Sequence, residues 1–256
     1  SSPNGAQGYF YNLCMEALAG RGVWKLHFYP WTMNPEYMTP GWVETKKQEL
    51  GRFFDQEYPS DAVECFLGSS KGYFSGIDLR NTFTAPSNTA RIPGHVYSAG
   101  IDFGQSADFT FMSVIDRTDN RQVDYLHINK MSWNLQRLEI VKMYRKWGLT
   151  SVRAEANSIG EVNIEELENS GLVVERFITS NKSKSLIMQK LYEGLENGLK
   201  LLNWEVQRAE LYSVESNQTP TGLWTVSAPT GLHDDTVIGT ALAVTAQIGK
   251  KEVKYY

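Results

Sequence analysis

Apolar and polar positions in the C-terminal two thirds of the chain predict a sheet built in two stages. Three strand-like runs, 96–103, 109–117 and 122–131, are separated by short polar turns, which is typical of an antiparallel meander. Two later runs, 151–156 and 173–179, each follow a helical pattern, so they need crossovers and parallel pairing. The pattern predicts an α/β domain with a mixed sheet flanked by helices.

Apolar residues at helical spacing predict the connecting helices. These are a helix with Leu135, Leu138, Val141 and Tyr144 on one face, a Glu-rich helix over about 160–169, and a helix with Ile187, Leu191, Leu195 and Leu199 in one stripe. The polar sequence SNQTPTG predicts the tip of an inserted hairpin between residues 199 and 229. A last helix follows Asp234 and Asp235.

The first 90 residues carry fewer and less regular elements. Helical spacing predicts a helix over about 10–18, VWKLHFYPW (23–31) predicts a strand, and Thr39-Pro40 predicts the start of a second helix. The stretch that follows combines Thr, Asn, Ser and Pro without apolar periodicity, which is typical of a linker. The predicted organisation is an N-terminal fragment over 1–78, a linker over 79–95 and a C-terminal domain over 96–256.

Composition and charge limit the class of protein. The 256 residues are 41% hydrophobic and 21% charged, which is typical of globular proteins and excludes disorder or a collagen-like repeat. Residues 1–90 hold 7 Lys and Arg against 9 Asp and Glu, and the rest hold 18 against 20, so any DNA contact must use a local patch. Neither a membrane span nor a signal peptide is predicted, and two distant cysteines predict neither a zinc site nor a disulfide framework.

Four acidic residues lie at the ends of predicted strands or at the start of a predicted helix. Asp102 follows an apolar run in GIDFG, where the flanking glycines allow a ligand to approach closely. Glu155 ends the run SVRAEA, and GLHDDTVIG places Asp234 and Asp235 before the last helix. If the strands of Asp102 and Glu155 are neighbours, all four carboxylates converge on one site.

Converging carboxylates repel one another, and hard divalent cations with oxygen ligands relieve that repulsion. The sequence therefore predicts a site for two divalent metal ions, Mg²⁺ or Mn²⁺. Two ions about 3.5–4 Å apart would activate a water and stabilise the departing oxygen of a phosphodiester. This chemistry is that of a nuclease, with Asp102, Glu155, Asp234 and Asp235 as the predicted catalytic and metal-binding residues.

Structural roles are an alternative for each of these residues. An Asp in a turn often shapes the turn, a Glu at a strand end is often only solvated, and an Asp pair before a helix offsets the helix dipole. The specificity therefore lies in the set. Asp108 either joins the site or shapes its turn, and His233 binds metal, assists proton transfer or packs on its own helix. The other histidines, His27, His95 and His127, have no partner at ligand spacing and are expected to be incidental.

Three basic residues are candidates for contacts with DNA phosphates. Lys182 and Lys184 lie in NKSKS at the start of a predicted helix, where backbone N–H groups also favour phosphate, and the alternative is that they only solvate a loop. Arg153 precedes Glu155 by two residues on the same side of its strand, so it either contacts phosphate or tempers the carboxylate charge. We expect little base preference, because phosphate contacts carry no sequence information.

Together these motifs resemble the nuclease domain of the large terminases of tailed bacteriophages, which is a member of the RNase H-like superfamily. The resemblance rests on GIDFGQSADFT, EANSIG, T-S-x-K-S and G-L-H-D-D, in the family's sequence order. It implies an RNase H-like mixed sheet, with three antiparallel strands followed by parallel ones. It also implies metal ligands at Asp102, Glu155 and one or both of Asp234 and Asp235; many relatives have Asp where this chain has Glu155.

The resemblance extends to the N-terminal part. SSPNG is similar to the coupling motif near the end of the terminase ATPase domain, which implies that residues 1–78 are a C-terminal fragment of a P-loop ATPase domain. No G-x-x-x-x-G-K-[ST] loop is present, so ATP hydrolysis is not expected. The family further implies double-stranded DNA as substrate, a role in DNA packaging, the portal protein and small terminase subunit as partners, and the host bacterial cytoplasm as location.

Two other functions share parts of the pattern. Sugar kinases and actin-like ATPases also begin with a strand and Asp-x-Gly, but they need a second Asp-Gly phosphate loop, and none follows residue 150. A non-catalytic module that binds DNA or docks on a capsid would keep the acidic cluster for structure alone. DNA cleavage that depends on Asp102 would distinguish a nuclease from both.

Overall fold

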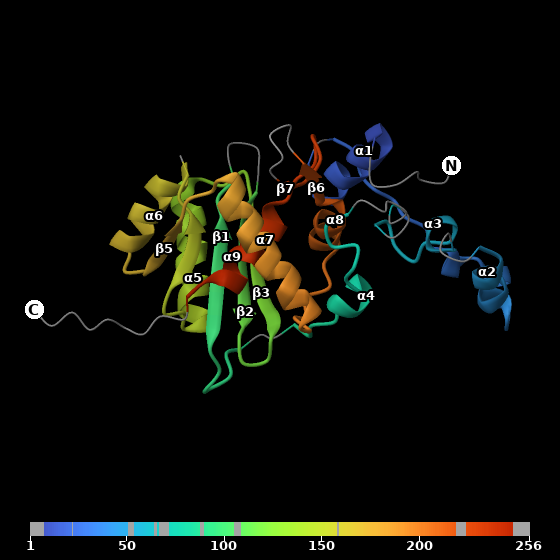
Figure 1. Cartoon of the computed structure of the whole chain (residues 1–256), viewed down its shortest axis with the longest axis horizontal. Helices are drawn as coiled ribbons and strands as arrows, with labels where there is room; N and C mark the ends of the chain where they lie inside the picture. Colours follow the sequence, from blue (N-terminus) through green and yellow to red (C-terminus); the bar gives the residue numbers. More distant parts are fainter. Residues whose placement is uncertain are drawn as a thin grey trace, which may run out of the picture. The chain divides into compact units, whose positions relative to one another are not determined.

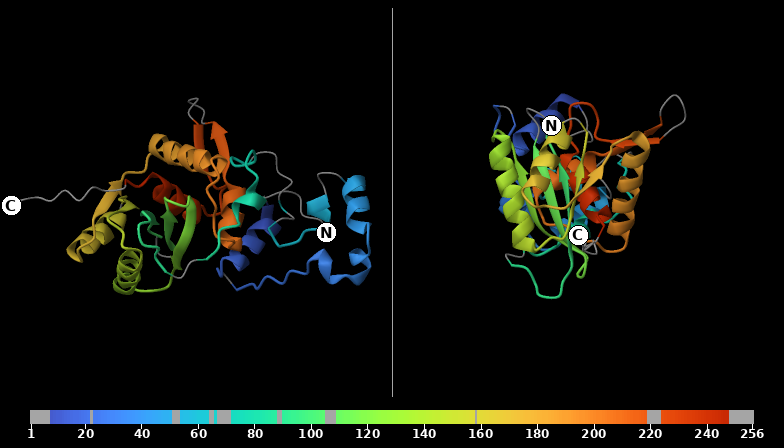
Figure 2. Two further views of the ribbon diagram at one scale, coloured as in Figure 1. Left: turned by 90° about the horizontal axis from the view of Figure 1, so that it is seen from below. Right: turned by 90° about the vertical axis from the view of Figure 1, so that its left-hand side faces the viewer.

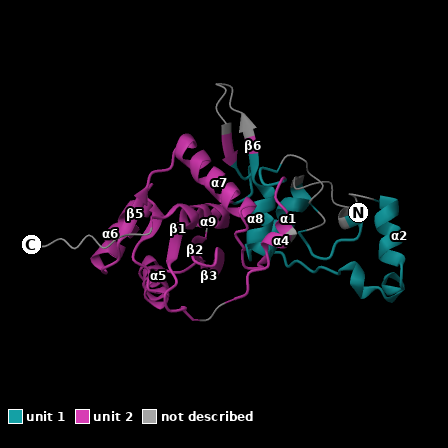
Figure 3. Cartoon of the chain, turned by 60° about the horizontal axis from the view of Figure 1, so that its bottom comes forward, with its two compact units in different colours: residues 1–75, 205–215, 227–233 teal, residues 76–204, 216–226, 234–256 magenta. Residues whose placement is uncertain are grey.

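The structure is a computed structural model that describes residues 8–21, 23–50, 54–63, 66, 72–87, 90–104, 109–157, 159–218 and 224–247. These residues form two compact units (Figure 3). The N-terminal unit comprises 1–75, 205–215 and 227–233, and the sheet unit comprises 76–204, 216–226 and 234–256.

A five-stranded mixed sheet organises the sheet unit (Figure 1). Its strands are β1 (Tyr97–Asp102), β2 (Thr110–Asp116), β3 (Arg121–Ile128), β4 (Val152–Glu155) and β5 (Val174–Phe177). The spatial order is β3-β2-β1-β4-β5, with antiparallel pairing from β3 to β1 and parallel pairing of β1 with β4 and of β4 with β5. The predicted meander followed by parallel strands is confirmed, as is the RNase H-like α/β class.

Helices cover both faces of this sheet (Figure 2). They are α5 (Trp133–Trp147), α6 (Ile159–Asn169), α7 (Asn181–Glu196) and α9 (Asp235–Thr245), and the short helix α4 (Leu79–Thr82) lies beside residues 200 and 201. Side chains of α5 and α6 share the main hydrophobic core with the sheet, whereas α9 packs on β1, β2 and β4 and is itself covered by α7. The sheet is therefore the middle layer of the unit.

Alternation along β1 explains why its two faces meet different partners. Tyr97, Ala99 and Ile101 point into the core shared with α5 and α6. Ser98 lies on the other face, where its Oγ donates to the carbonyl of Ala243 in α9 at 2.8 Å. Residue 102, which ends the strand, therefore falls on the face covered by α9.

Between α7 and the last helix, the structure contains one element that the sequence analysis did not predict. The predicted hairpin is present as β6 (Glu215–Gln218) and β7 (Trp224–Ser227), although its expected tip lies mainly outside the described residues. Helix α8 (Glu205–Ser213), which precedes the hairpin, is new. Its buried residues include Val206, Ala209 and Leu211.

The N-terminal unit contains α1 (Gly8–Leu18), α2 (Trp42–Leu50), α3 (Phe54–Glu57), α8 and two short 3-10 helices, Trp31–Met33 and Pro35–Met38. The predicted strand over 23–31 is wrong. Residues 23–30 have no regular structure, and Val23 and Tyr29 are exposed. Strand propensity alone is insufficient here, because a strand needs a neighbour to receive its backbone hydrogen bonds.

Each of the two units is built from segments that are not contiguous in the sequence. The segments 205–215 and 227–233 group with residues 1–75, whereas the predicted linker 79–95 lies within the sheet unit. The ATPase origin of residues 1–78 and the predicted domain boundaries stay predictions. In the part of the chain that the structure describes, no helix is long and apolar enough to cross a membrane.

Candidate metal centre

Asp102 and Glu155 end two neighbouring parallel strands. The register pairs Ile101 of β1 with Ala154 of β4, so the next residue on each strand is one of the two acids. Ile101 and Ala154 both point into the core with α5 and α6. Because side chains alternate along a strand, both carboxylates point to the opposite face, under α9. The adjacency that the sequence analysis required is therefore present.

Helix α9 brings a third carboxylate to the same place, because its first residue is Asp235. Asp102, Glu155 and Asp235 line one cavity of about 190 Å³ in the sheet unit. The remaining lining residues are Phe103, Gly104, Asn157, Ile159 and Gly160. The cavity has room for several water molecules, since about 10–15 Å³ of such volume holds one.

The electrostatics of the cavity are dominated by negative charge. Burial raises the pKa of the Asp102 carboxyl well above its usual value, and the charges of Asp235, Glu155 and Asp234 raise that pKa further. A hydrogen bond with Glu155 adds to the same effect. Three carboxylates on one cavity are a donor set that hard divalent cations fit, because a cation offsets their charge and takes oxygen ligands.

Asp234 occupies a different position from Asp235. It is the N-cap residue of α9, but its side chain makes no capping hydrogen bond. Instead its Oδ2 lies 2.8 Å from Nζ of Lys184, and both side chains are largely shielded from solvent. The predicted pair is thus divided, with Asp235 lining the cavity and Asp234 held beside it by a lysine from α7.

Of the two remaining candidates, Asp108 and His233, the structure describes His233. Asp108 lies outside the described residues. Nε2 of His233 lies 3.3 Å from Oε1 of Glu16, within the N-terminal unit. This contact gives His233 a partner that its sequence neighbours do not indicate.

The basic candidates also differ in their surroundings. Nε of Arg153 lies 3.3 Å from Oε1 of Glu175 on β5, and its Nη1 donates to the carbonyl of Thr245 at the end of α9 at 2.9 Å. Lys182 is exposed in the first turn of α7. Of the three, Lys182 therefore has the surroundings that best suit a contact with DNA phosphate, whereas Arg153 and Lys184 are engaged by protein carboxylates.

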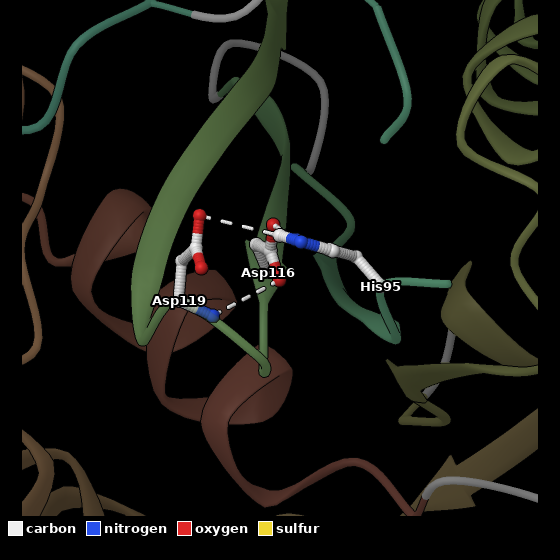
Figure 4. A group of neighbouring side chains, drawn as sticks. All are labelled: His95, Asp116 and Asp119. Atoms are coloured by element: carbon white, nitrogen blue, oxygen red, sulfur yellow. Dashed lines mark hydrogen bonds and ion pairs between the residues drawn. The ribbon is translucent and has the colours of Figure 1, made fainter. Parts of the chain in front are cut away.

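A second cluster of ionisable groups lies at the opposite end of β1 and β2 (Figure 4). Among the described residues, His95, Asp116 and Asp119 form the one group of His, Cys, Asp or Glu whose ligand atoms all lie within 4.8 Å. The acids around Asp102 are spread more widely. Wider spacing is compatible with a pair of ions, because residues that ligate different ions need not touch one another.

Hydrogen bonds explain this second cluster without a metal. Nδ1 of His95 lies 2.7 Å from Oδ2 of Asp116, and Oδ1 of Asp116 accepts from the backbone N–H groups of Thr118 and Asp119. The fully buried Asp116 carboxylate therefore closes the β2–β3 turn, and Asp119 also pairs with Arg121. The sequence analysis did not find this partner of His95, because Asp116 is 21 residues away in sequence.

The sequence analysis quoted the motif around Asn157 and Gly160 without assigning either residue a role. Both line the cavity, because α6 begins directly behind Glu155. A Cβ at Gly160 would lie 2.0 Å from the carbonyl oxygen of Glu155, so only glycine allows this approach. The signal was the N-x-I-G sequence that immediately follows the acidic strand end.

Fold and cavity together define an RNase H-like α/β domain with an acidic site at the carboxyl ends of β1 and β4. The large terminase subunit of Thermus virus P23-45 is 26% identical over 210 residues, which are 79% of this chain and 42% of the relative, and that of Thermus phage G20c matches equally. The chain thus spans about two fifths of the length of these relatives. No family model matches the chain.

Solved structures give the same result for the fold. The large terminase nuclease from the thermophilic phage G20c with bound magnesium has a TM-score of 0.61 at 23% identity, covering 69% of this chain and 97% of that one. The HK97 bacteriophage large terminase has a TM-score of 0.53 at 14% identity, covering 83% of this chain and 52% of that one. These similarities confirm the resemblance to phage large terminases, and the fold is that of a terminase nuclease domain.

Proposed function

We propose that the sheet unit is a metal-dependent endonuclease that cuts double-stranded DNA by two-metal-ion hydrolysis during phage genome packaging. The observation that carries this proposal is the convergence of Asp102, Glu155 and Asp235, from three distant segments, on one cavity. Solved terminase nucleases with this fold contain magnesium, cobalt, zinc or manganese, which supports a divalent cation as the cofactor.

Each acid has a stated role in the proposal. Asp102 and Glu155 hold the ions from the ends of β1 and β4, and Asp235 holds them from the start of α9, with Asp234 as an adjacent ligand or source of charge. Two divalent ions, Mg²⁺ or Mn²⁺, would lower the pKa of the attacking water and offset the charge of the phosphodiester. The sheet and α9 fix the carboxylates before substrate binds, so little reorganisation is needed.

The proposal includes the partners that the family resemblance implies. These are double-stranded DNA, the portal protein and the small terminase subunit, with the host bacterial cytoplasm as the site of action. DNA would be held through its phosphates by Lys182, and by Lys184 or Arg153 only where the ion pairs that they form are exchanged for phosphate. We therefore expect weak affinity that falls with salt.

Cleavage of supercoiled plasmid tests the proposal directly. We expect nicked and linear products with Mn²⁺ or Mg²⁺, and no products when a chelator removes the ions, because the carboxylates alone supply no activated water. Product analysis on a gel over a series of metal concentrations measures this dependence. Cleavage that persists in the chelator, or none with any divalent ion, would contradict the proposal.

A thermal shift assay separates the rival functions. A sugar-kinase or actin-like protein would be stabilised by ATP, whereas the proposed nuclease should respond to Mn²⁺ without nucleotide. A module that only binds DNA or docks on a capsid would bind plasmid without cutting it. Either of these results would replace the nuclease by the corresponding alternative.

Lys182 provides a prediction about DNA binding. We expect Lys182→Ala to reduce the slope of log affinity against log salt concentration by about one, because one phosphate contact is lost. Fluorescence anisotropy of a labelled duplex at several salt concentrations measures the slope. Lys142→Ala is the control, because this lysine is exposed on α5 and pairs with Glu139. An unchanged slope for Lys182→Ala would show that Lys182 does not contact a DNA phosphate and is only a solvent-exposed surface lysine.

A further inference from the structure

Asn157 connects the carboxylate of Glu155 to the neighbouring strand. Its Nδ2 donates to Oε1 of Glu155 at 3.2 Å and to the carbonyl of Thr179 at 3.3 Å. Its Oδ1 accepts from the backbone N–H of Thr179, also at 3.3 Å. The two hydrogens of the amide are thus divided between the acid and the backbone that follows β5.

The backbone on both sides of Asn157 is also fixed. Ala156 donates its N–H to the carbonyl of Phe177 at 2.9 Å, which continues the pairing of β4 with β5. The carbonyl of Asn157 accepts from the N–H of Gly160 at 2.9 Å, at the start of α6. With its main chain held at both ends and its amide paired with Thr179, the side chain has little freedom to turn away from Glu155.

This geometry points to Asn157 as a positioning residue that orients the Glu155 carboxylate for a divalent cation, an inference that rests on the proposed function. An amide N–H donates to one carboxylate oxygen and leaves the remaining lone pairs for a metal ion. Because Asn is neutral, it orients the acid without adding charge to the cavity or competing as a cation. Groups that hold a metal ligand in place typically change metal affinity by 10- to 100-fold when removed.

Mn²⁺ titration followed by electron paramagnetic resonance of the free ion tests this inference without using cleavage. We expect Asn157→Ala to weaken Mn²⁺ binding by about 10- to 100-fold. Asn157→Ser should have the same effect, because its shorter hydroxyl does not reach Oε1 of Glu155. Cleavage by either variant should return to within a few-fold of wild type at saturating Mn²⁺, since the ligand itself is still present.

A purely structural role predicts different results. It would lower the melting temperature and leave Mn²⁺ affinity unchanged, as we expect for Asn134→Ala, a control at an exposed asparagine that bonds Arg137 on α5. In a Glu155→Gln background, Asn157→Ala should cost no more than about twofold in affinity, because its effect passes through the carboxylate. A full additional loss in that background would overturn the inference.

Failure of the inference and failure of the proposed function are distinguishable. If the wild-type protein binds Mn²⁺ and cuts DNA but Asn157→Ala and Asn157→Ser bind the ion equally well, the inference alone is overturned. If the wild-type protein binds no Mn²⁺, the metal-dependent nuclease is overturned and the inference falls with it.

Discussion

Asp102→Asn is expected to reduce plasmid cleavage at least about 1,000-fold, equivalent to about 4 kcal/mol of transition-state stabilisation. The substitution keeps the size of the side chain but removes the charge of a carboxylate that lines the cavity and ends β1. Initial rates of plasmid nicking at saturating Mn²⁺ measure the loss, and Mn²⁺ titration shows whether the variant still binds the ion.

The same substitution should stabilise the protein in the absence of metal. Burial and the neighbouring acids raise the pKa of Asp102, so its ionised form destabilises the folded state at neutral pH. An acid whose pKa is raised by folding destabilises the folded state fully when the pH is above its folded-state pKa. It does not destabilise the folded state when the pH is below its unfolded-state pKa. The gain in melting temperature from Asp102→Asn should therefore be largest at high pH and vanish in acid. The stabilisation that Mn²⁺ gives the wild-type protein should be mostly lost in Asp102→Asn.

Asp119→Asn is the matched control. Asp119 belongs to the second cluster of ionisable groups, beside His95 and Asp116, at the other end of the sheet. We expect this variant to bind Mn²⁺ and to cut DNA like wild type, because hydrogen bonds account for that cluster without a metal. If Asp119→Asn lost cleavage and Asp102→Asn kept it, the metal centre would lie at the His95 end of β1, which would contradict the proposed site.

Gly100→Ala is expected to have the largest effect on stability, at least about 3 kcal/mol of unfolding free energy. A Cβ at this position in β1 would lie 2.2 Å from the backbone nitrogen of Ala243 and 2.3 Å from the carbonyl oxygen of Gly239. Both atoms belong to the backbone of α9, so no side chain can move to make room. The helix as a whole must shift from the sheet.

Thermal unfolding followed by circular dichroism should show Gly100→Ala melting roughly 6–12 °C below wild type. Because Asp235 begins α9, the displaced helix should also weaken Mn²⁺ binding. Gly194→Ala in α7 is the control, since a Cβ there would make ordinary contacts of 3.6–4.0 Å. It should stabilise the protein by about 0.5–1 kcal/mol, as alanine usually does in a helix interior. Equal melting temperatures for the two variants would refute the close-approach argument.

Local periodicity in the sequence was sufficient to predict most elements of the sheet unit. Alternation and helical spacing depend on neighbours within a few residues, so the five strands and their connecting helices were predicted within a few residues of their bounds. The strand predicted over 23–31 is wrong because strand formation also depends on a pairing partner, which periodicity does not supply. Helix α8 was missed, although its buried apolar residues provide a helical signal.

The acidic residues of the site were found from the sequence because strand ends and helix starts are local features. The sequence analysis could only assume that the strands of Asp102 and Glu155 are neighbours. The structure shows that they pair in parallel, although the two segments are some 50 residues apart in sequence. Which carboxylate of the last pair lines the cavity also depends on tertiary contacts. Asp235 does so, whereas Asp234 contacts Lys184, which lies 50 positions away.

Sequence alone thus determined the order of the strands and helices and the identity of the acids, since both are recorded by short-range pattern. Tertiary structure decided which side chains form hydrogen bonds with one another, including Asn157 with Glu155 and His95 with Asp116. It also decided the close approach of α9 to β1 at Gly100. Those contacts depend on the distance between segments that are far apart in the chain. That distance is fixed by the packing of the whole sheet unit, which no local pattern encodes.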